Sequence, residues 1–146
     1  MKKFFVVVGM VLLSITILAQ KGELKISISN IKSNTGNIKV ALYDKENGEG
    51  FLKNIDVAIR KKILTINEKN AGVIFSNIPY GTYAVSLFHD ENNNGEMDRA
   101  SIGFPLEPYG VSGNKFIIGP PKFNDCKFII NSPSKNITIE MKSFKN

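Results

Sequence analysis

The stretch from Phe75 to Asp98 reads FSNIPYGTYAVSLFHDENNNGEMD and carries the clearest structural signals in the 146-residue chain. Large apolar side chains alternate with smaller ones at its centre, at Tyr83, Val85 and Leu87. A period of two predicts a β-strand with one buried face. Just before this strand, Pro79 and Gly81 favour a tight turn, because proline presets φ and glycine tolerates positive φ. The stretch therefore predicts a strand, a turn, a second strand and then a polar loop.

The same alternation recurs elsewhere in the chain. It is clear in three further segments, Leu24–Ile28, Ile38–Leu42 and Ile137–Met141. Weaker strand candidates are Val57–Arg60, Ile63–Ile66, Gly72–Phe75, Phe116–Ile118 and Lys127–Ile130. A sustained helical period is missing from the sequence after position 20, although Phe51–Arg60 could form one or two helical turns. About seven short strands separated by turns predict an all-β fold, an antiparallel Greek-key β-sandwich.

The first 19 residues predict an export signal rather than part of this fold. Basic residues at positions 2 and 3 precede a short apolar run, Phe4–Leu18, and Ala19 is the small residue expected before a cleavage site. We expect cleavage after Ala19, which leaves one β-sandwich domain of residues 20–146 in the periplasm or outside a bacterial cell. The alternatives are an uncleaved anchor or a buried strand. The run is, however, shorter than the ~20 residues of a membrane-spanning helix, so no span is expected after cleavage.

Composition narrows the classes of function. The chain has 19 Lys and Arg residues against 13 Asp and Glu, and its net charge of +6 falls to +4 once the two N-terminal lysines are removed. Apart from the run at positions 60–62 these charges are scattered, so nucleic acid is not an expected partner. With Cys126 and His89 as the only residues of their types, an internal disulfide and the multi-Cys or multi-His metal sites are excluded.

The polar loop has the spacing of a calcium-binding loop. The predicted ligands are the side chains of Asp90, Asn92, Asn94 and Asp98 and the backbone carbonyl of Glu96. Gly95 stands where such a loop turns sharply. The pattern departs from an EF-hand, because position twelve is Ser101 instead of a bidentate Glu and a strand, not a helix, precedes the loop. With only two carboxylates in the loop, we expect a dissociation constant in the ~10⁻⁴–10⁻³ M class. A distant carboxylate such as Glu107 could complete the site. The alternative is an ordinary hairpin turn, since Asn and Gly tolerate left-handed backbone.

These motifs resemble two groups of known proteins. The segment FSNIPYGTY at positions 75–83 resembles the strand junction of transthyretin-like and carboxypeptidase-regulatory-like sandwiches, which implies a prealbumin-like fold and says little about function. The pattern YAVSLFHDENNNGEMD, followed by GFPLEPYGVS and GPPKF, resembles the DUF2141 family over Leu24–Met141. That resemblance implies a small exported bacterial protein, common in Bacteroidetes, with a β-sandwich and no established activity.

Two hypotheses of function follow. The favoured one is an exported, non-catalytic, calcium-stabilised module that binds a protein, peptide or glycan. Its expected ligand surface comprises His89, Phe104, Glu107 and Tyr109. The second is a small hydrolase in which His89 acts as a general base beside Glu107. The alternative role for His89 is that of a core-edge residue that supports the loop.

Two further side chains are weaker candidates for a nucleophile. Ser112 lies outside any G-x-S-x-G motif, which is the usual setting of a serine nucleophile in one large class of hydrolases. Cys126 directly precedes a predicted strand, so we expect it to be buried.

Overall fold

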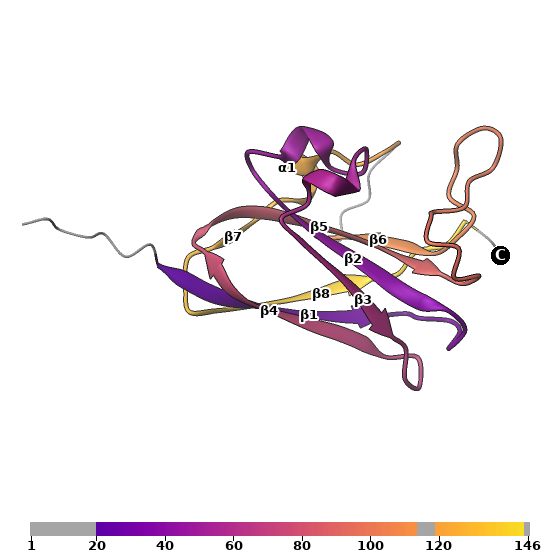
Figure 1. The fold of residues 1–146 in the computed structure, drawn as a ribbon, viewed down its shortest axis with the longest axis horizontal. Coiled ribbons are helices and arrows are strands. Elements are labelled where there is room, and N and C mark those ends of the chain that lie inside the picture. The colour runs from indigo at the N-terminus through magenta and orange to yellow at the C-terminus, as the bar shows by residue number, and fades with distance from the viewer. Residues whose placement is uncertain (1–19, 114–118, 145–146) are drawn as a thin grey trace, which may run out of the picture.

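Alternating apolar side chains build two sheets that pack face to face in the computed structural model, which describes residues 20–113 and 119–144 (Figure 1). The three-stranded sheet has the order β4-β1-β8, with β1 at Lys21–Ser29, β4 at Ala71–Pro79 and β8 at Ser134–Glu140. The five-stranded sheet has the order β3-β2-β5-β6, with β7 also paired to β5. Its strands are β2 (Asn37–Asp44), β3 (Arg60–Thr65), β5 (Gly81–Asp90), β6 (Tyr109–Val111) and β7 (Phe128–Ile130). The predicted all-β fold is confirmed, whereas the predicted signal peptide lies outside the described residues.

One strand pair departs from the expected antiparallel topology. β1 is antiparallel to β4 but parallel to β8, with Leu24 opposite Lys135 and Ile28 opposite Ile139. The other strand pairs of the two described sheets are antiparallel. A parallel pair requires a long crossover, and here β2 to β7 intervene in the chain between the two partners. The predicted antiparallel sandwich therefore contains one parallel pair, β1 with β8, which the sequence pattern did not indicate.

The main hydrophobic core lies between the two sheets. It contains Leu24, Ile26 and Ile28 of β1, Ile38, Val40 and Leu42 of β2, and Tyr83, Val85 and Leu87 of β5. These are the alternating residues predicted to face inward. A second core covers the opposite face of the five-stranded sheet, where Phe51 packs edge-on against Tyr43 at 5.3 Å and against Phe123 at 6.3 Å between ring centroids. Cys126 is fully buried there, as predicted.

Short helical turns carry the residues of this second core. They are the 3-10 turns η1 (Gly48–Gly50) and η2 (Ile55–Val57) and the helix α1 (Phe123–Cys126), which cover the top of the sandwich in Figure 1. The helical turns expected within 51–60 are thus present as η2 alone. The strand expected at Val57–Arg60 was wrong, because β3 begins at Arg60.

The remaining weak strand candidates have clear outcomes. Those at 63–66, 72–75 and 127–130 correspond to β3, β4 and β7. The one at 116–118 lies outside the described residues. Within residues 20–113 and 119–144, no helix has the length and apolar character needed to cross a membrane.

Candidate functional site

Asp90, the last residue of β5, is fully buried, and its carboxylate holds the polar loop that follows. Its Oδ1 accepts a hydrogen bond from the backbone N–H of Asn94 (3.1 Å), and its Oδ2 accepts one from that of Gly95 (3.0 Å). The ammonium group of Lys39 lies 3.4 Å from Oδ2. A buried carboxylate needs such partners, because burial of an isolated charge is strongly unfavourable. The Asp90 side chain is therefore a fixed point around which the loop turns.

The other predicted ion ligands bond to one another. The side-chain amides of Asn92 and Asn94 donate to the two carboxylate oxygens of Asp98 at 2.7 and 2.9 Å. Their side-chain oxygens accept backbone N–H groups two residues on, from Asn94 (3.0 Å) and Glu96 (2.9 Å). The structure thus gathers the predicted ligands into one turn. Throughout the described ranges, no three or more His, Cys, Asp or Glu residues are grouped to hold a metal ion, so calcium binding stays a prediction.

Glu107 joins the two ends of this loop. Its buried carboxylate accepts the backbone N–H of Glu91 at Oε1 (2.9 Å) and that of Asp98 at Oε2 (3.1 Å). The first amide directly follows β5, and the second lies at the end of the predicted ion loop. The carboxylate of Asp90 therefore holds the turn of the loop, and the carboxylate of Glu107 holds the two ends of the loop together. Each carboxylate accepts two backbone amides and so satisfies donors of the loop.

His89 is buried beside this closure. It lies opposite Ile38 in the β2–β5 pair, and its Nε2 donates to the carbonyl oxygen of Thr35 (2.5 Å). Because a carbonyl can only accept, Nε2 carries a hydrogen in this contact. Nδ1 has no hydrogen-bond partner among the described residues. The carboxylate of Glu107 is bonded to the amides of Glu91 and Asp98, not to the imidazole.

Ser112 and Cys126 share a second buried contact. The Ser112 hydroxyl donates to the backbone carbonyl of Cys126 (2.6 Å) and accepts the backbone N–H of Val85 (2.9 Å). These bonds tie the end of β6 to both α1 and β5. The hydroxyl is therefore engaged on both its donor and its acceptor side.

An apolar patch lies where the segment that follows the ion loop meets Phe144 near the C-terminus. We define it as Ile102, Phe104, Leu106 and Phe144, whose exposed fractions are 80%, 53%, 41% and 59%. The ring of Phe144 contacts Phe104 edge-on, with centroids 5.5 Å apart, and stacks on Tyr109 at 5.8 Å. Tyr109 itself is half-buried, and burial raises the pKa of its phenol. Of the predicted ligand surface, Phe104 and Tyr109 thus reach solvent, whereas His89 and Glu107 are buried.

The backbone of this segment is held in a protruding hairpin-like loop. The N–H of Ala100 donates to Phe104 (2.9 Å), and the N–H of Gly103 donates back to Ala100 (2.8 Å). At its base, the N–H of Leu106 donates to the carbonyl of Asp98 (2.8 Å). The loop stands away from the sheets at the right of Figure 1, drawn in orange. Phe144 was missed as a site residue, because it is distant in sequence and no motif includes it.

Comparison with known proteins gives one family and one distant structural likeness. Residues 26–138 match the family DUF2141, which is described as an uncharacterized protein conserved in bacteria. No curated protein matches the chain. A solved structure with some similarity is that of a fimbrial assembly protein from Parabacteroides distasonis ATCC 8503, at 10% identity and a TM-score of 0.44. The match covers 85% of this chain and 53% of that protein, so the chain spans about half of its length.

Proposed function

The chain belongs to the DUF2141 family of bacterial proteins, and we propose that it is an exported, non-catalytic module that binds a partner through the apolar patch. The observation that carries this proposal is that Phe104, on a loop held by backbone hydrogen bonds, contacts the exposed ring of Phe144, and that Ile102 on the same loop is also exposed. Grouped apolar side chains on a surface are characteristic of interaction sites. We expect a protein or peptide, because the four side chains of the patch offer no polar group for the hydroxyls of a glycan.

The internal support of the loop favours binding. Glu107 and the backbone bonds at Asp98 hold the base of the loop before any partner arrives. A surface that is already ordered loses less conformational entropy on association, so more of its contact energy remains as affinity. The aromatic contacts of Phe144 with Phe104 and Tyr109 restrict these rings in the same way.

The hydrolase alternative has less support. A general base must reach the proton it abstracts, and His89 is buried with its Nε2 on a backbone carbonyl. Its proposed partner Glu107 accepts two backbone amides inside the loop closure. The hydrogen bonds of both residues to the backbone therefore give each a structural role that accounts for its burial.

We also propose that the ion loop binds calcium weakly. An ion would take oxygens from Asp90, Asn92, Asn94 and Asp98 and from the carbonyl of Glu96. It would replace the two amide bonds to Asp98 and would share Asp90 with the ammonium group of Lys39. That competition supports a dissociation constant in the ~10⁻⁴–10⁻³ M class.

Photo-cross-linking in the producing bacterium tests the binding surface. A photoreactive phenylalanine analogue at position 104 should yield a discrete cross-linked product. The matched control is position 74, because Ile74 on β4 and Phe104 are both 53% exposed. A second substitution, Ile102→Ser, should remove the product at position 104. Identical products from both positions, or none from position 104, would overturn the assignment of the patch.

Thermal melts test the calcium proposal. Calcium at about ten times its dissociation constant should stabilise the fold by about 1.4 kcal/mol, which is a shift of several degrees relative to chelator. Asp98→Asn is the suitable variant, because the half-exposed Asp98 contributes less to the fold than the buried Asp90. The variant should melt equally with calcium and with chelator. If the unaltered protein melts at the same temperature with calcium and with chelator, the ion site is refuted.

A further inference from the structure

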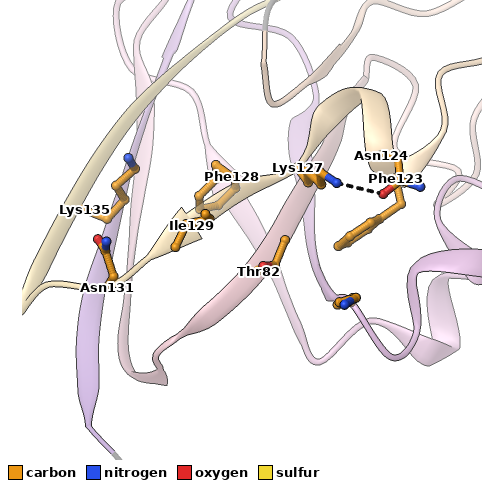
Figure 2. Close-up of a pocket in the computed structure, with 9 residues that line it drawn as sticks. Thr82, Phe123, Asn124, Lys127, Phe128, Ile129, Asn131 and Lys135 are labelled. Atoms are coloured by element: carbon orange, nitrogen blue, oxygen red, sulfur yellow. Dashed lines mark hydrogen bonds between the residues drawn. The ribbon is translucent and has the colours of Figure 1, made fainter.

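A pocket of about 570 Å³ lies at strand β7 (Figure 2), and none of its lining residues belongs to the apolar patch. Residues of β5, β7, β8 and α1 line it, together with the turn after β2. Its charged side chains are Lys45, Lys127 and Lys135, and none of its nine lining residues is acidic. The described elements thus bring three ammonium groups from separate parts of the chain to one hollow.

We propose that this pocket binds an acidic oligosaccharide, whose sugar rings carry carboxylate or sulfate groups. This site is independent of the apolar patch and of the partner proposed for it.

The pocket lysines have no carboxylate partners in the described part of the chain, where the salt bridges are Lys39 with Asp90 and Lys61 with Asp56. Two acids close to these lysines in sequence, Asp44 and Asp125, accept hydrogen bonds from other residues. Asp44, beside Lys45, accepts the backbone and side-chain amides of Asn47 at 2.9 and 2.8 Å. Asp125, two residues before Lys127, accepts the backbone N–H of Lys122 at 2.9 Å. A cleft lined by one sign of charge concentrates ligands of the opposite sign.

The polar groups occur as two ammonium–amide pairs. Lys127 donates to the side-chain oxygen of Asn124 (3.2 Å), so the N–H₂ group is the part of the Asn124 amide that can still donate. Lys135 and Asn131 form the other group, and β7 lies between the two groups in Figure 2. An Asn side chain both donates and accepts, so it matches neighbouring hydroxyls, while each lysine supplies a point charge for an anion.

The apolar part of the pocket separates these two groups. Phe128 is half-buried and Ile129 is 57% exposed, and both lie on β7 in the middle of Figure 2. Ile129 offers an exposed apolar contact for the C–H face of a sugar ring, and Phe128, which packs partly against the main core, adds its accessible part. Thr82, opposite Ile129 in the β5–β7 pair, adds a hydroxyl. A chain of charged sugars carries anionic groups, hydroxyls and apolar ring faces along its length, and these match the lysines, the polar side chains and the apolar side chains of the pocket.

An acidic peptide fits the pocket less well. An extended peptide binds a sheet edge chiefly through main-chain hydrogen bonds. β7 has only three residues, Phe128–Ile130, so it offers few such bonds. The lining also contains no arginine, the side chain whose planar fork pairs best with carboxylates in peptides.

Titration calorimetry of the purified protein tests the proposal with four probes. They are an oligogalacturonate, a heparin-derived oligosaccharide, a neutral malto-oligosaccharide and an oligoglutamate of matched charge. We expect at least one acidic oligosaccharide to bind, more tightly than the malto-oligosaccharide and the oligoglutamate. The one that binds identifies the anion as carboxylate or sulfate. Lack of binding by both, or tighter binding of the oligoglutamate, would overturn the proposal.

Matched variants separate a built site from general attraction. Lys127→Gln and Lys135→Gln should each weaken binding about tenfold, the loss expected for one bond to a charged group. The control Lys25→Gln removes the same charge from the exposed face of β1 and should leave affinity unchanged. Asn131→Ala keeps every charge and should still weaken binding of the oligosaccharide. Equal losses for Lys25→Gln and the pocket variants, or no loss for Asn131→Ala, would reduce the effect to net charge and refute the site.

Discussion

The ammonium group of Lys39 lies 3.4 Å from a carboxylate oxygen of Asp90, whose side chain has no exposed surface. The two residues come from neighbouring antiparallel strands, β2 and β5. The Asp90 carboxylate also accepts the backbone N–H groups of Asn94 and Gly95, so one buried charge is met by three donors. This arrangement makes the start of the ion loop part of the folded core, whether or not an ion binds.

Asp90→Ala should therefore destabilise the fold strongly. The substitution removes a buried acceptor, leaves the backbone N–H of Gly95 without its partner and leaves Lys39 without its carboxylate, so we expect a loss of about 3 kcal/mol in unfolding free energy. Asp98→Ala removes two side-chain bonds at the surface and should cost no more than about 1 kcal/mol. Urea unfolding in the presence of chelator measures both values. Equal losses would mean that Asp90 has no special structural role.

Glu107→Gln should loosen the ion loop without unfolding the sandwich. The glutamine keeps one acceptor oxygen but turns an N–H₂ group toward Glu91 or Asp98, so one of the two amides loses its bond. We expect a cost of about 2 kcal/mol and faster hydrogen exchange at the amides of residues 91 and 98. Exchange followed by mass spectrometry or NMR gives the result. Slow exchange at both amides in the variant would show that other contacts close the loop.

Gly36 and Gly103 provide a matched pair for backbone strain. Both have positive φ, at +76° and +87°, but a Cβ on Gly36 would lie 2.1 Å from the carbonyl oxygen of Asp90, whereas Gly103 has nothing within 4 Å. Gly103→Ala should cost about 1 kcal/mol, from its conformation alone. Gly36→Ala should cost about 3 kcal/mol or more, because the β2–β5 end must also move. Thermal or urea unfolding measures the loss of stability in each variant. Equal losses for Gly36→Ala and Gly103→Ala would show that the close approach of Gly36 to Asp90 is not costly.

Alkaline pH should destabilise the protein through its buried tyrosines. Burial raises the pKa of Tyr43 and of Tyr83 above the ordinary 10.0, and for Tyr83 the negative Asp44 adds to the effect. The folded state therefore holds these phenol protons more tightly than the unfolded state. The resulting stability is fully present below about pH 10 and is lost as pH rises through the higher folded pKa.

Tyr83→Phe isolates one of these contributions. The variant loses the hydrogen bond from the Tyr83 hydroxyl to the carbonyl of Pro79 (2.6 Å), so near pH 8 it should be less stable by about 1 kcal/mol. Above pH 10 its disadvantage should shrink, because it has no phenol to ionise at that position. Thermal melts across this pH range measure the difference in stability between the variant and the unaltered protein. A difference that stays constant or grows above pH 10 would contradict the raised pKa of Tyr83.

The sandwich could be predicted because most of its strands follow one simple rule. Alternation at Leu24–Ile28, Ile38–Leu42 and Tyr83–Leu87 identified the inward face, and these side chains form the main core. β6 was not predicted, because a strand of three residues, Tyr109–Val111, is too short to show a period. The parallel pairing of β1 with β8 was also hidden, since strand direction depends on the path of the whole chain.

The candidate site was only partly visible in the sequence. The oxygen-bearing positions 90–98 are regularly spaced, so the loop could be recognised from its pattern. Glu107 could not be assigned its role, because its two amide partners are 9 and 16 positions away. Phe144 and the lysine-lined pocket share that difficulty, as both arise where distant segments meet.

The parallel pairing of β1 and β8 bears on how the protein responds to mechanical force. Seven residue pairs, from Glu23–Ser134 to Ser29–Glu140, join the two strands, and the chain enters β1 at one end of the sandwich and leaves β8 at the other (Figure 1). Tension applied between the two ends would therefore slide the strands along each other and load all their hydrogen bonds together. An antiparallel pair pulled from one end would instead open one bond at a time. The described domain should therefore resist extension when it is pulled from both of its ends.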